Sequence, residues 1–298
     1  MSVSVGPVIA ALFTGIQVGA ALVASRYVID QTTPATLTML RYSIGLLCLI
    51  PFVSLVNTAR FQRRDILPIC FLGVFQFGVL VALLNYALQY LPSAHVALIF
   101  ATFPLQTMIL ASIFGKERLS ATKTVGILLS ITGVAVTLGE SLGTNDMGDN
   151  KAIAVAAVAL SAFIGAVCSI FYRPYLERYP AQNISALAMF ASVVVLLVFS
   201  IFENGLITIV HINFDGWLAV IFIGISSGVG YFAWLWSLKS LSPTRVTMFL
   251  SLGPISSAVL GSIFLSEPIT LYLVFGMVLV VTGLCIGLMR PKRKKAPV

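Results

Sequence analysis

Long apolar runs without charge recur along the chain and leave it few ways to fold. Hydrophobic residues make up 59% of its 298 residues and charged residues 9%, whereas soluble domains carry about 25% charged residues. A helix needs roughly 20 apolar residues to cross the hydrocarbon core of a bilayer. We therefore predict an all-α membrane protein with ten transmembrane helices. They are expected at residues 7–28, 34–57, 66–90, 92–114, 121–139, 152–174, 181–202, 214–238, 243–264 and 269–289.

The second half of the chain repeats the first at an offset of 150 residues. Each copy would contain five spans, and an odd number of spans places the two copies in opposite orientations. Inverted repeats of this kind are typical of secondary transporters. The matched pairs include Gly78 and Gly228, Pro104 and Pro254, Glu117 and Glu267, and Gly133 and Gly283. The predicted parts are a first five-helix repeat at 1–140, an external linker at 141–151, a second five-helix repeat at 152–290 and a basic cytoplasmic tail at 291–298.

The net charge of +8 follows a membrane topology and does not indicate a nucleic-acid surface. Alternate predicted loops carry most of the 18 lysines and arginines, and the opposite loops are neutral or acidic, as at Asp146 and Asp149. Positive loops favour the cytoplasmic side. Both termini are therefore expected in the cytoplasm, with the protein in the inner (plasma) membrane of a bacterium. The basic tail is either a topology anchor or a contact for anionic lipids.

Two sets of short motifs, one in each copy, resemble a known family. Residues 85–91 read Asn-Tyr-Ala-Leu-Gln-Tyr-Leu and residues 115–119 read Gly-Lys-Glu-Arg-Leu; the second copy has Trp-Ser-Leu-Lys-Ser-Leu at 236–241 and Ser-Glu-Pro at 266–268. Over essentially the whole chain, these motifs resemble the EamA family of the drug/metabolite transporter superfamily. Arg41 matches an arginine that such proteins often carry in span two. The resemblance implies export of amino acids or other small metabolites, and with it proton coupling as an open possibility.

Polar and aromatic side chains at membrane depth are expected to face the interior of the bundle, because exposure of polar groups to lipid is costly. Polarity at both positions of a repeat pair, as at Gln76 and Ser226, favours a cavity lining. Hydrogen bonds between helices and, for aromatic residues, a lipid-facing belt are the alternatives. The predicted substrate pathway consists of Gln17, Arg41, Gln76, Tyr86, His95, Thr102, Gln106, Tyr172, Ser226, Tyr231, Trp234 and Ser256.

Charge inside the predicted spans constrains the substrate. Arg41 either snorkels outward or binds backbone carbonyls, or it receives a substrate carboxylate. All ten acidic residues fall in loops or at span ends, which argues against cationic drugs and against a buried proton-carrying carboxylate. We therefore predict a secondary transporter that exports small neutral or zwitterionic metabolites by alternating access. Multidrug efflux and metabolite uptake are the alternatives within transport.

Four residues near span centres or ends are candidates for moving parts. Pro104 and Pro254 lie near the middle of spans four and nine, where proline kinks a helix; they are candidate hinges or static bends. Glu117 and Glu267 are expected to cap helices or form loop salt bridges, with gating as the alternative.

An enzyme is the rival from a different class. Residues 224–228 match the GxSxG motif of serine hydrolases, but that motif requires a strand–turn–helix context and here lies in an apolar run. Gly224 and Gly228 equally form a GxxxG packing pair. We predict no catalytic residues, no metal site and no cofactor, and a membrane receptor is a further alternative. The expected partners are a small-molecule substrate and the lipid bilayer, without nucleic acid; monomer and homodimer both stay open.

Overall fold

The computed structural model describes residues 5–55, 61–115, 121–143, 149–241, 245–246 and 249–288, and all its regular elements there are helices. This confirms the predicted all-α class. The first copy contains α1 (Val5–Val28), η1 (Ile29–Gln31), α2 (Pro34–Leu55), α3 (Arg63–Gly73), η2 (Val74–Val79), α4 (Leu80–Leu88), α5 (Ser93–Phe100), α6 (Phe103–Ile113) and α7 (Ala121–Gly143). The second contains α8 (Asp149–Phe171), α9 (Arg173–Leu176), α10 (Ala181–Phe202), α11 (Gly205–Thr208), η3 (Ile209–His211), α12 (Phe214–Ser240), η4 (Phe249–Ser251), α14 (Leu252–Leu265) and α15 (Leu271–Leu288).

Seven helical segments of the described chain are long and apolar enough to cross a bilayer. Predicted span seven, 181–202, coincides with α10. Predicted spans five, nine and ten correspond to shorter apolar helices, at Thr124–Thr137, Phe249–Leu265 and Leu271–Gly283. Within the described residues, the structure therefore shows seven candidate spans and three shorter apolar helices, and ten full-length spans are not confirmed.

Three of the predicted spans depart from regular α-helical geometry near their centres. Span three passes through the π-helical turn η2 between α3 and α4. Span four is interrupted between α5 and α6, and Pro104 lies in the first turn of α6, where its missing N–H costs nothing. Span nine changes from the 3₁₀ turn η4 to α14, with Pro254 in the first turn of α14. In both copies the helix therefore breaks just before the matched proline.

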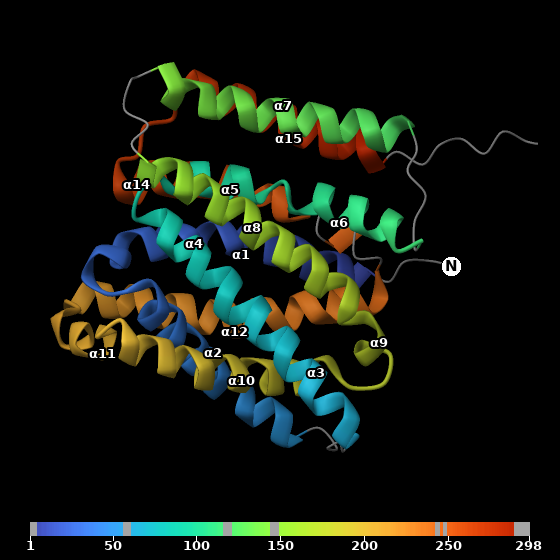
Figure 1. The fold of residues 1–298 in the computed structure, drawn as a ribbon, viewed down its shortest axis with the longest axis vertical. Coiled ribbons are helices and arrows are strands. Elements are labelled where there is room, and N and C mark those ends of the chain that lie inside the picture. Colours follow the sequence, from blue (N-terminus) through green and yellow to red (C-terminus); the bar gives the residue numbers. More distant parts are fainter. Residues whose placement is uncertain are drawn as a thin grey trace, which may run out of the picture.

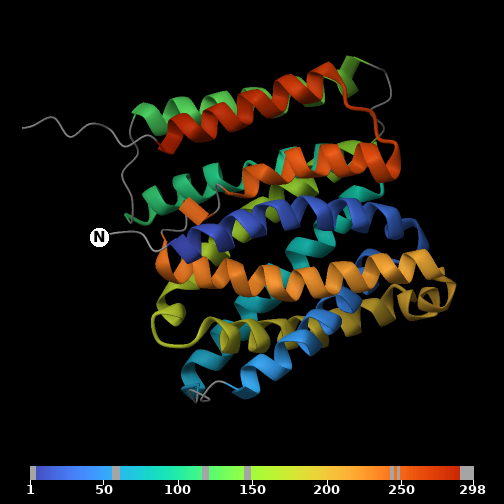
Figure 2. The ribbon, with the colours of Figure 1, turned by 180° about the vertical axis from the view of Figure 1, so that it is seen from behind.

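The two copies pack reciprocally. Helix α1 of the first copy packs against α12 and α14 of the second, and α8 of the second copy packs against α4 and α6 of the first. Helices α7 and α15 form a separate outer layer at the top of Figures 1 and 2. A Cβ atom on Gly133 would lie 2.7 Å from the backbone oxygen of Gly276, so glycine permits this close pairing. Reciprocal packing is what a two-fold relation between the copies requires.

Helices α2 and α12 also approach through glycines. A Cβ atom on Gly228 would lie 2.8 Å from the Gly45 backbone oxygen, and one on Gly224 would lie 2.5 Å from Ile44 Cβ. The GxSxG residues thus sit within an unbroken helix and pack it closely against α2. This confirms the packing interpretation of that motif.

Candidate functional site

A cavity of about 90 Å³ lies between the two copies. Its walls come from the central parts of α1, α2, α4 and α12, with contributions from η2, α5, α6 and η4. The lining residues are Thr14, Gln17, Val18, Leu22, Arg41, Tyr42, Gln76, Phe77, Leu80, Val81, Leu84, Phe100, Phe103, Ser227, Gly230, Tyr231, Trp234 and Leu250. A mostly apolar pocket with a few convergent polar groups is the usual form of a small-molecule site.

Arg41 is the charged residue of this lining, and it is 9% exposed. Its Nε donates to Ser227 Oγ at 2.7 Å, and its guanidinium carbon lies 5.5 Å from the centroid of the Tyr42 ring. Among the described residues, no carboxylate pairs with it. A guanidinium has five N–H donors arranged for bidentate binding of a carboxylate. The donors beyond Nε are thus left for an anionic group in the cavity.

The cavity reproduces the sequence repeat along one helix face. Four lining residues of span three have lining counterparts in α12 at the offset of 150 residues. Span four and span nine add one more such pair, Phe100 and Leu250. The α12 pairs are Phe77 with Ser227, Leu80 with Gly230, Val81 with Tyr231, and Leu84 with Trp234. The duplicated helices therefore present the same face to the cavity with different side chains.

Aromatic rings form much of the wall. Phe77 packs between Tyr42 and Tyr231, with ring centroids 4.7 and 4.0 Å away. Phe103 packs against Trp234, with centroids 5.9 Å apart. Aromatic faces accept apolar groups and also attract cations. This wall can therefore contact either the side chain or the ammonium group of a small zwitterion.

Five of the predicted pathway residues line the cavity: Gln17, Arg41, Gln76, Tyr231 and Trp234. Gln17 Nε2 donates to Ser226 Oγ at 3.2 Å, which places Ser226 behind the lining rather than in it. A Cβ atom on Gly230 would lie 2.6 Å from Gln17 Oε1, so the glycine leaves room for this side chain.

The other predicted pathway residues lie elsewhere. Thr102 and Gln106 bond each other at the α5–α6 break, and Gln106 also donates to the backbone oxygen of Ala159 at 3.3 Å. Ser256 donates to the backbone oxygen of Ile16 at 3.2 Å. Tyr172 is fully buried in the core, while Tyr86 and His95 are half-buried outside the lining. Gln106 and Ser256 thus form hydrogen bonds between helices, which was the alternative to a place in the cavity lining.

Sequence reasoning missed Thr14, Tyr42 and Ser227, which supply hydroxyl groups to the cavity. Thr14 Oγ1 donates to the backbone oxygen of Gly230 at 3.2 Å, across the two copies. Paired polarity does not mark Ser227, because its counterpart at the 150-residue offset is the apolar Phe77. Thr14 carries no such signal either, because threonine is a common residue type in packed membrane helices.

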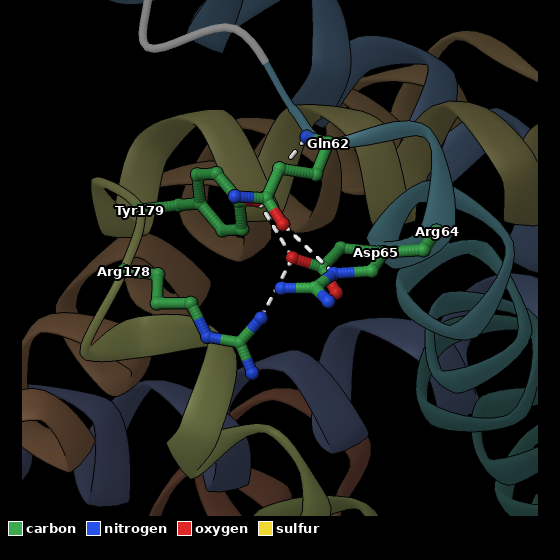
Figure 3. A network of polar contacts seen from close by, with 5 residues as sticks. All are labelled: Gln62, Arg64, Asp65, Arg178 and Tyr179. Atoms are coloured by element: carbon green, nitrogen blue, oxygen red, sulfur yellow. Dashed lines mark hydrogen bonds and ion pairs between the residues drawn. The ribbon is translucent and has the colours of Figure 1, made fainter.

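Asp65 joins the two copies at one end of the bundle, as Figure 3 shows. Its Oδ2 accepts hydrogen bonds from Arg178 Nη1 at 2.9 Å and from the Tyr179 hydroxyl at 2.7 Å. The Tyr179 oxygen in turn accepts from the backbone N–H of Gln62 at 3.2 Å. Asp65 lies in the first turn of α3 in the first copy, and Arg178 and Tyr179 follow α9 of the second. We call this the Asp65 end.

Glutamates of the second copy cap helices of the first at the opposite end. Glu267 accepts from the backbone N–H of Ser93, the first residue of α5, at 3.0 Å, and from its hydroxyl at 2.5 Å. Glu203 accepts from the backbone N–H of Ala35, in the first turn of α2, at 3.3 Å. Negative charge at a helix N-terminus is stabilising. This confirms the predicted cap at Glu267; Glu117 lies outside the described residues.

The family follows from a comparison with known protein families. The model of the EamA-like transporter family matches residues 6–139 and 152–289, which cover both copies. The chain belongs to the EamA-like transporter family. It is thus a membrane transporter and not an enzyme, and the serine hydrolase alternative is excluded.

Relatives of this EamA-like transporter agree with that assignment. An uncharacterized transporter from Archaeoglobus fulgidus is 29% identical over 90% of this chain and 93% of its own length. A probable terminal-alkyne amino-acid exporter from Streptantibioticus cattleyicolor is 25% identical over 87% of this chain and 85% of its own. A solved crystal structure has a TM-score of 0.76 with 20% sequence identity over 99% of each chain. At that identity the likeness shows the fold alone.

Proposed function

We propose that this protein exports small zwitterionic metabolites resembling amino acids by alternating access between two inverted five-helix repeats. The observation that carries the proposal is Arg41, a buried cation in the central cavity without a carboxylate partner among the described residues. A charge at membrane depth is costly and marks a substrate path by default. A substrate carboxylate would supply the missing partner.

Two further observations support a small solute. The cavity volume of about 90 Å³ is well below the roughly 300–1,000 Å³ of pockets for drug-sized ligands. A relative is named a probable amino-acid exporter, which is consistent with a carboxylate at Arg41. Both points favour amino-acid-like solutes over multidrug efflux.

Reconstitution in proteoliposomes tests the substrate class. Counterflow of labelled amino acids is measured with the wild-type protein, with Arg41→Lys and with Arg41→Gln. We expect Arg41→Gln to reduce transport efficiency about 10- to 150-fold, the value of a charged hydrogen bond of about 1.5–3 kcal/mol. Arg41→Lys should retain more activity, because it keeps the charge and loses only the bidentate geometry.

Arg173→Gln is the matched control, because Arg173 pairs with Glu177 at a half-exposed position away from the cavity. It should transport like the wild type. Absence of flux for every amino acid in the wild-type protein would contradict the substrate class. Full activity of Arg41→Gln would contradict the role of Arg41.

The proposed orientation places both termini in the cytoplasm and the Glu267 end outside. Val210 is 84% exposed in the segment after α11, at the Glu267 end. An impermeant maleimide should label Val210→Cys in intact cells. If Val210→Cys is labelled only after the membrane is permeabilised, the orientation is opposite to the one proposed. Adding a pH gradient to the counterflow assay distinguishes proton coupling from facilitated diffusion.

A further inference from the structure

Gln76 has a buried hydrogen-bond acceptor that nothing in the described protein satisfies. The residue is 9% exposed and lines the cavity that also contains Arg41. Its Oε1 atom is buried and accepts no hydrogen bond. An unpaired buried carbonyl oxygen is costly, so this position calls for a donor that arrives with a ligand.

The backbone at Gln76 is unusual in a way that the second copy does not share. Gln76 lies in the π-helical turn η2, where the N–H of Leu80 donates to the oxygen of Phe75, five residues earlier. Helix α12 runs through the matched position without such a turn. Gln76 lines the cavity, whereas its counterpart Ser226 does not. Single π-helical turns within α-helices occur frequently at functional sites.

Packing holds this turn in place. The residue after Gln76 is Phe77, which is 1% exposed and packs between the rings of Tyr42 and Tyr231. Tyr42 is the neighbour of Arg41 on α2, and Tyr231 lies on α12. The turn that carries Gln76 is therefore fixed relative to the helix that carries Arg41.

The described lining of the cavity offers no carboxylate to the ammonium group of a zwitterion, since Arg41 is the charged residue among those lining residues. An ammonium group brought there must find neutral acceptors or aromatic faces. Gln76 Oε1 is such an acceptor, and the rings of Tyr42 and Tyr231 lie on either side of the adjacent Phe77.

We propose that Gln76 Oε1 accepts a hydrogen bond from the α-ammonium group of the substrate and so makes the transporter prefer 2-amino acids to 2-hydroxy acids. This inference rests on the proposed function, in which Arg41 holds the carboxylate. Gln76 adds the second point of recognition. A 2-hydroxy acid keeps the carboxylate and the side chain but brings a weaker, uncharged donor.

The experiment compares phenylalanine with 3-phenyllactate, which share a side chain and a carboxylate. Counterflow in proteoliposomes gives KM and the maximal rate for each compound with wild type, Gln76→Met and Gln76→Leu. Both variants remove the acceptor, and Gln76→Met nearly preserves the length and volume. We expect KM for phenylalanine to rise about tenfold in both variants, with KM for phenyllactate changed less than about twofold.

Gln182→Leu, at a half-buried position of α10 outside the cavity, makes the same chemical change and should alter neither KM. Melting temperatures in detergent show whether each variant is folded. Equal losses for both compounds in Gln76→Met and Gln76→Leu, or no change for either, would overturn the role of Gln76 alone. Wild-type protein that transports no amino acid at all would instead overturn the proposed function, and this inference with it.

Discussion

Span three and helix α12 are related by the 150-residue offset, yet they line the cavity with chemically different side chains. Span three contributes Phe77, Leu80, Val81 and Leu84, and α12 contributes Ser227, Gly230, Tyr231 and Trp234. At the first two pairs the larger side chain belongs to span three, and at the last two pairs it belongs to α12. The two helices therefore use equivalent faces to line the cavity, but the side chains on those faces differ.

This difference indicates that the arrangement of the helices around the cavity and the selectivity of the cavity have separate origins. Duplication places matched faces around a common cavity, which is the arrangement that alternating access requires. In the proposed mode of binding, recognition comes from departures between the copies: Arg41 and Gln76 belong to the first, and the hydroxyl of Ser227 that bonds Arg41 belongs to the second. Matched substitutions in the two copies should therefore have unequal effects.

The largest difference is expected at the matched glycines Gly78 and Gly228. A Cβ atom on Gly228 would meet the backbone of Gly45, which cannot move aside, whereas one on Gly78 would meet Ser192 Oγ at 3.2 Å, a side-chain atom that can rotate. We expect Gly228→Ala to reduce the free energy of unfolding by about 1–3 kcal/mol through overpacking. Gly78→Ala should be nearly neutral. Thermal melting in detergent measures both, and similar shifts for the two variants would contradict this asymmetry.

The next difference concerns cavity size at the pair Leu80 and Gly230. Leu80→Ala enlarges the cavity, and Gly230→Ala pushes its Cβ toward Gln17 Oε1 and reduces the space. One methylene in a pocket changes selectivity about 10- to 200-fold. We expect Leu80→Ala to raise transport of phenylalanine relative to alanine about tenfold, and Gly230→Ala to lower it.

Leu98→Ala is the control for that pair, because Leu98 is 1% exposed and lies outside the cavity lining. It should lower the melting temperature without changing the ratio of the two transport efficiencies. If Leu98→Ala changes the ratio as much as Leu80→Ala does, cavity volume does not determine the preference.

Much of this arrangement was predictable from the sequence, because the length of the apolar runs and the internal repeat are signals that extend over whole helices. Span seven was located to the residue, and Gln17, Arg41, Gln76, Tyr231 and Trp234 were identified as polar or aromatic groups at depth. The π-helical turn at Gln76 was not predictable, since it depends on tertiary packing around Phe77. The position of Gln106 outside the cavity lining was not predictable for a related reason: its partner, the backbone oxygen of Ala159, lies on a helix 53 residues away in sequence.

A smaller difference is expected at Asp65 and Asp215, which are related by the 150-residue offset and lie in the first turns of α3 and α12. Asp65 bonds Arg178 and Tyr179 across the copies (Figure 3), whereas Asp215 is exposed in the first turn of α12. Asp65→Asn removes the charge that stabilises this contact. It should increase the equilibrium constant for opening at the Asp65 end about threefold. Asp215→Asn should have no such effect.

Labelling of Val81→Cys, a cavity position, reports that opening when an impermeant maleimide is added to either side of oriented proteoliposomes. Asp65→Asn should speed labelling from the Asp65 end and leave labelling from the other end unchanged or slower. Unchanged rates from both ends would mean that the Asp65 contact does not restrain the moving parts.

The smallest effect is expected at Ser226, the counterpart of Gln76. Its hydroxyl accepts from Gln17 Nε2 at 3.2 Å and donates to the backbone oxygen of Ile223 at 3.2 Å, both at part-buried positions. Ser226→Ala removes one neutral hydrogen bond behind the cavity wall, and Gln17 remains in the cavity. Transport should therefore fall less than about threefold, for amino and hydroxy acids alike. Suppose that Ser226→Ala raised KM for the amino acid as much as Gln76→Met does and likewise left KM for the hydroxy acid unchanged. Both copies would then take part in recognition of the ammonium group. The π-helical turn would then have no special role, and selectivity would follow from the duplicated frame itself.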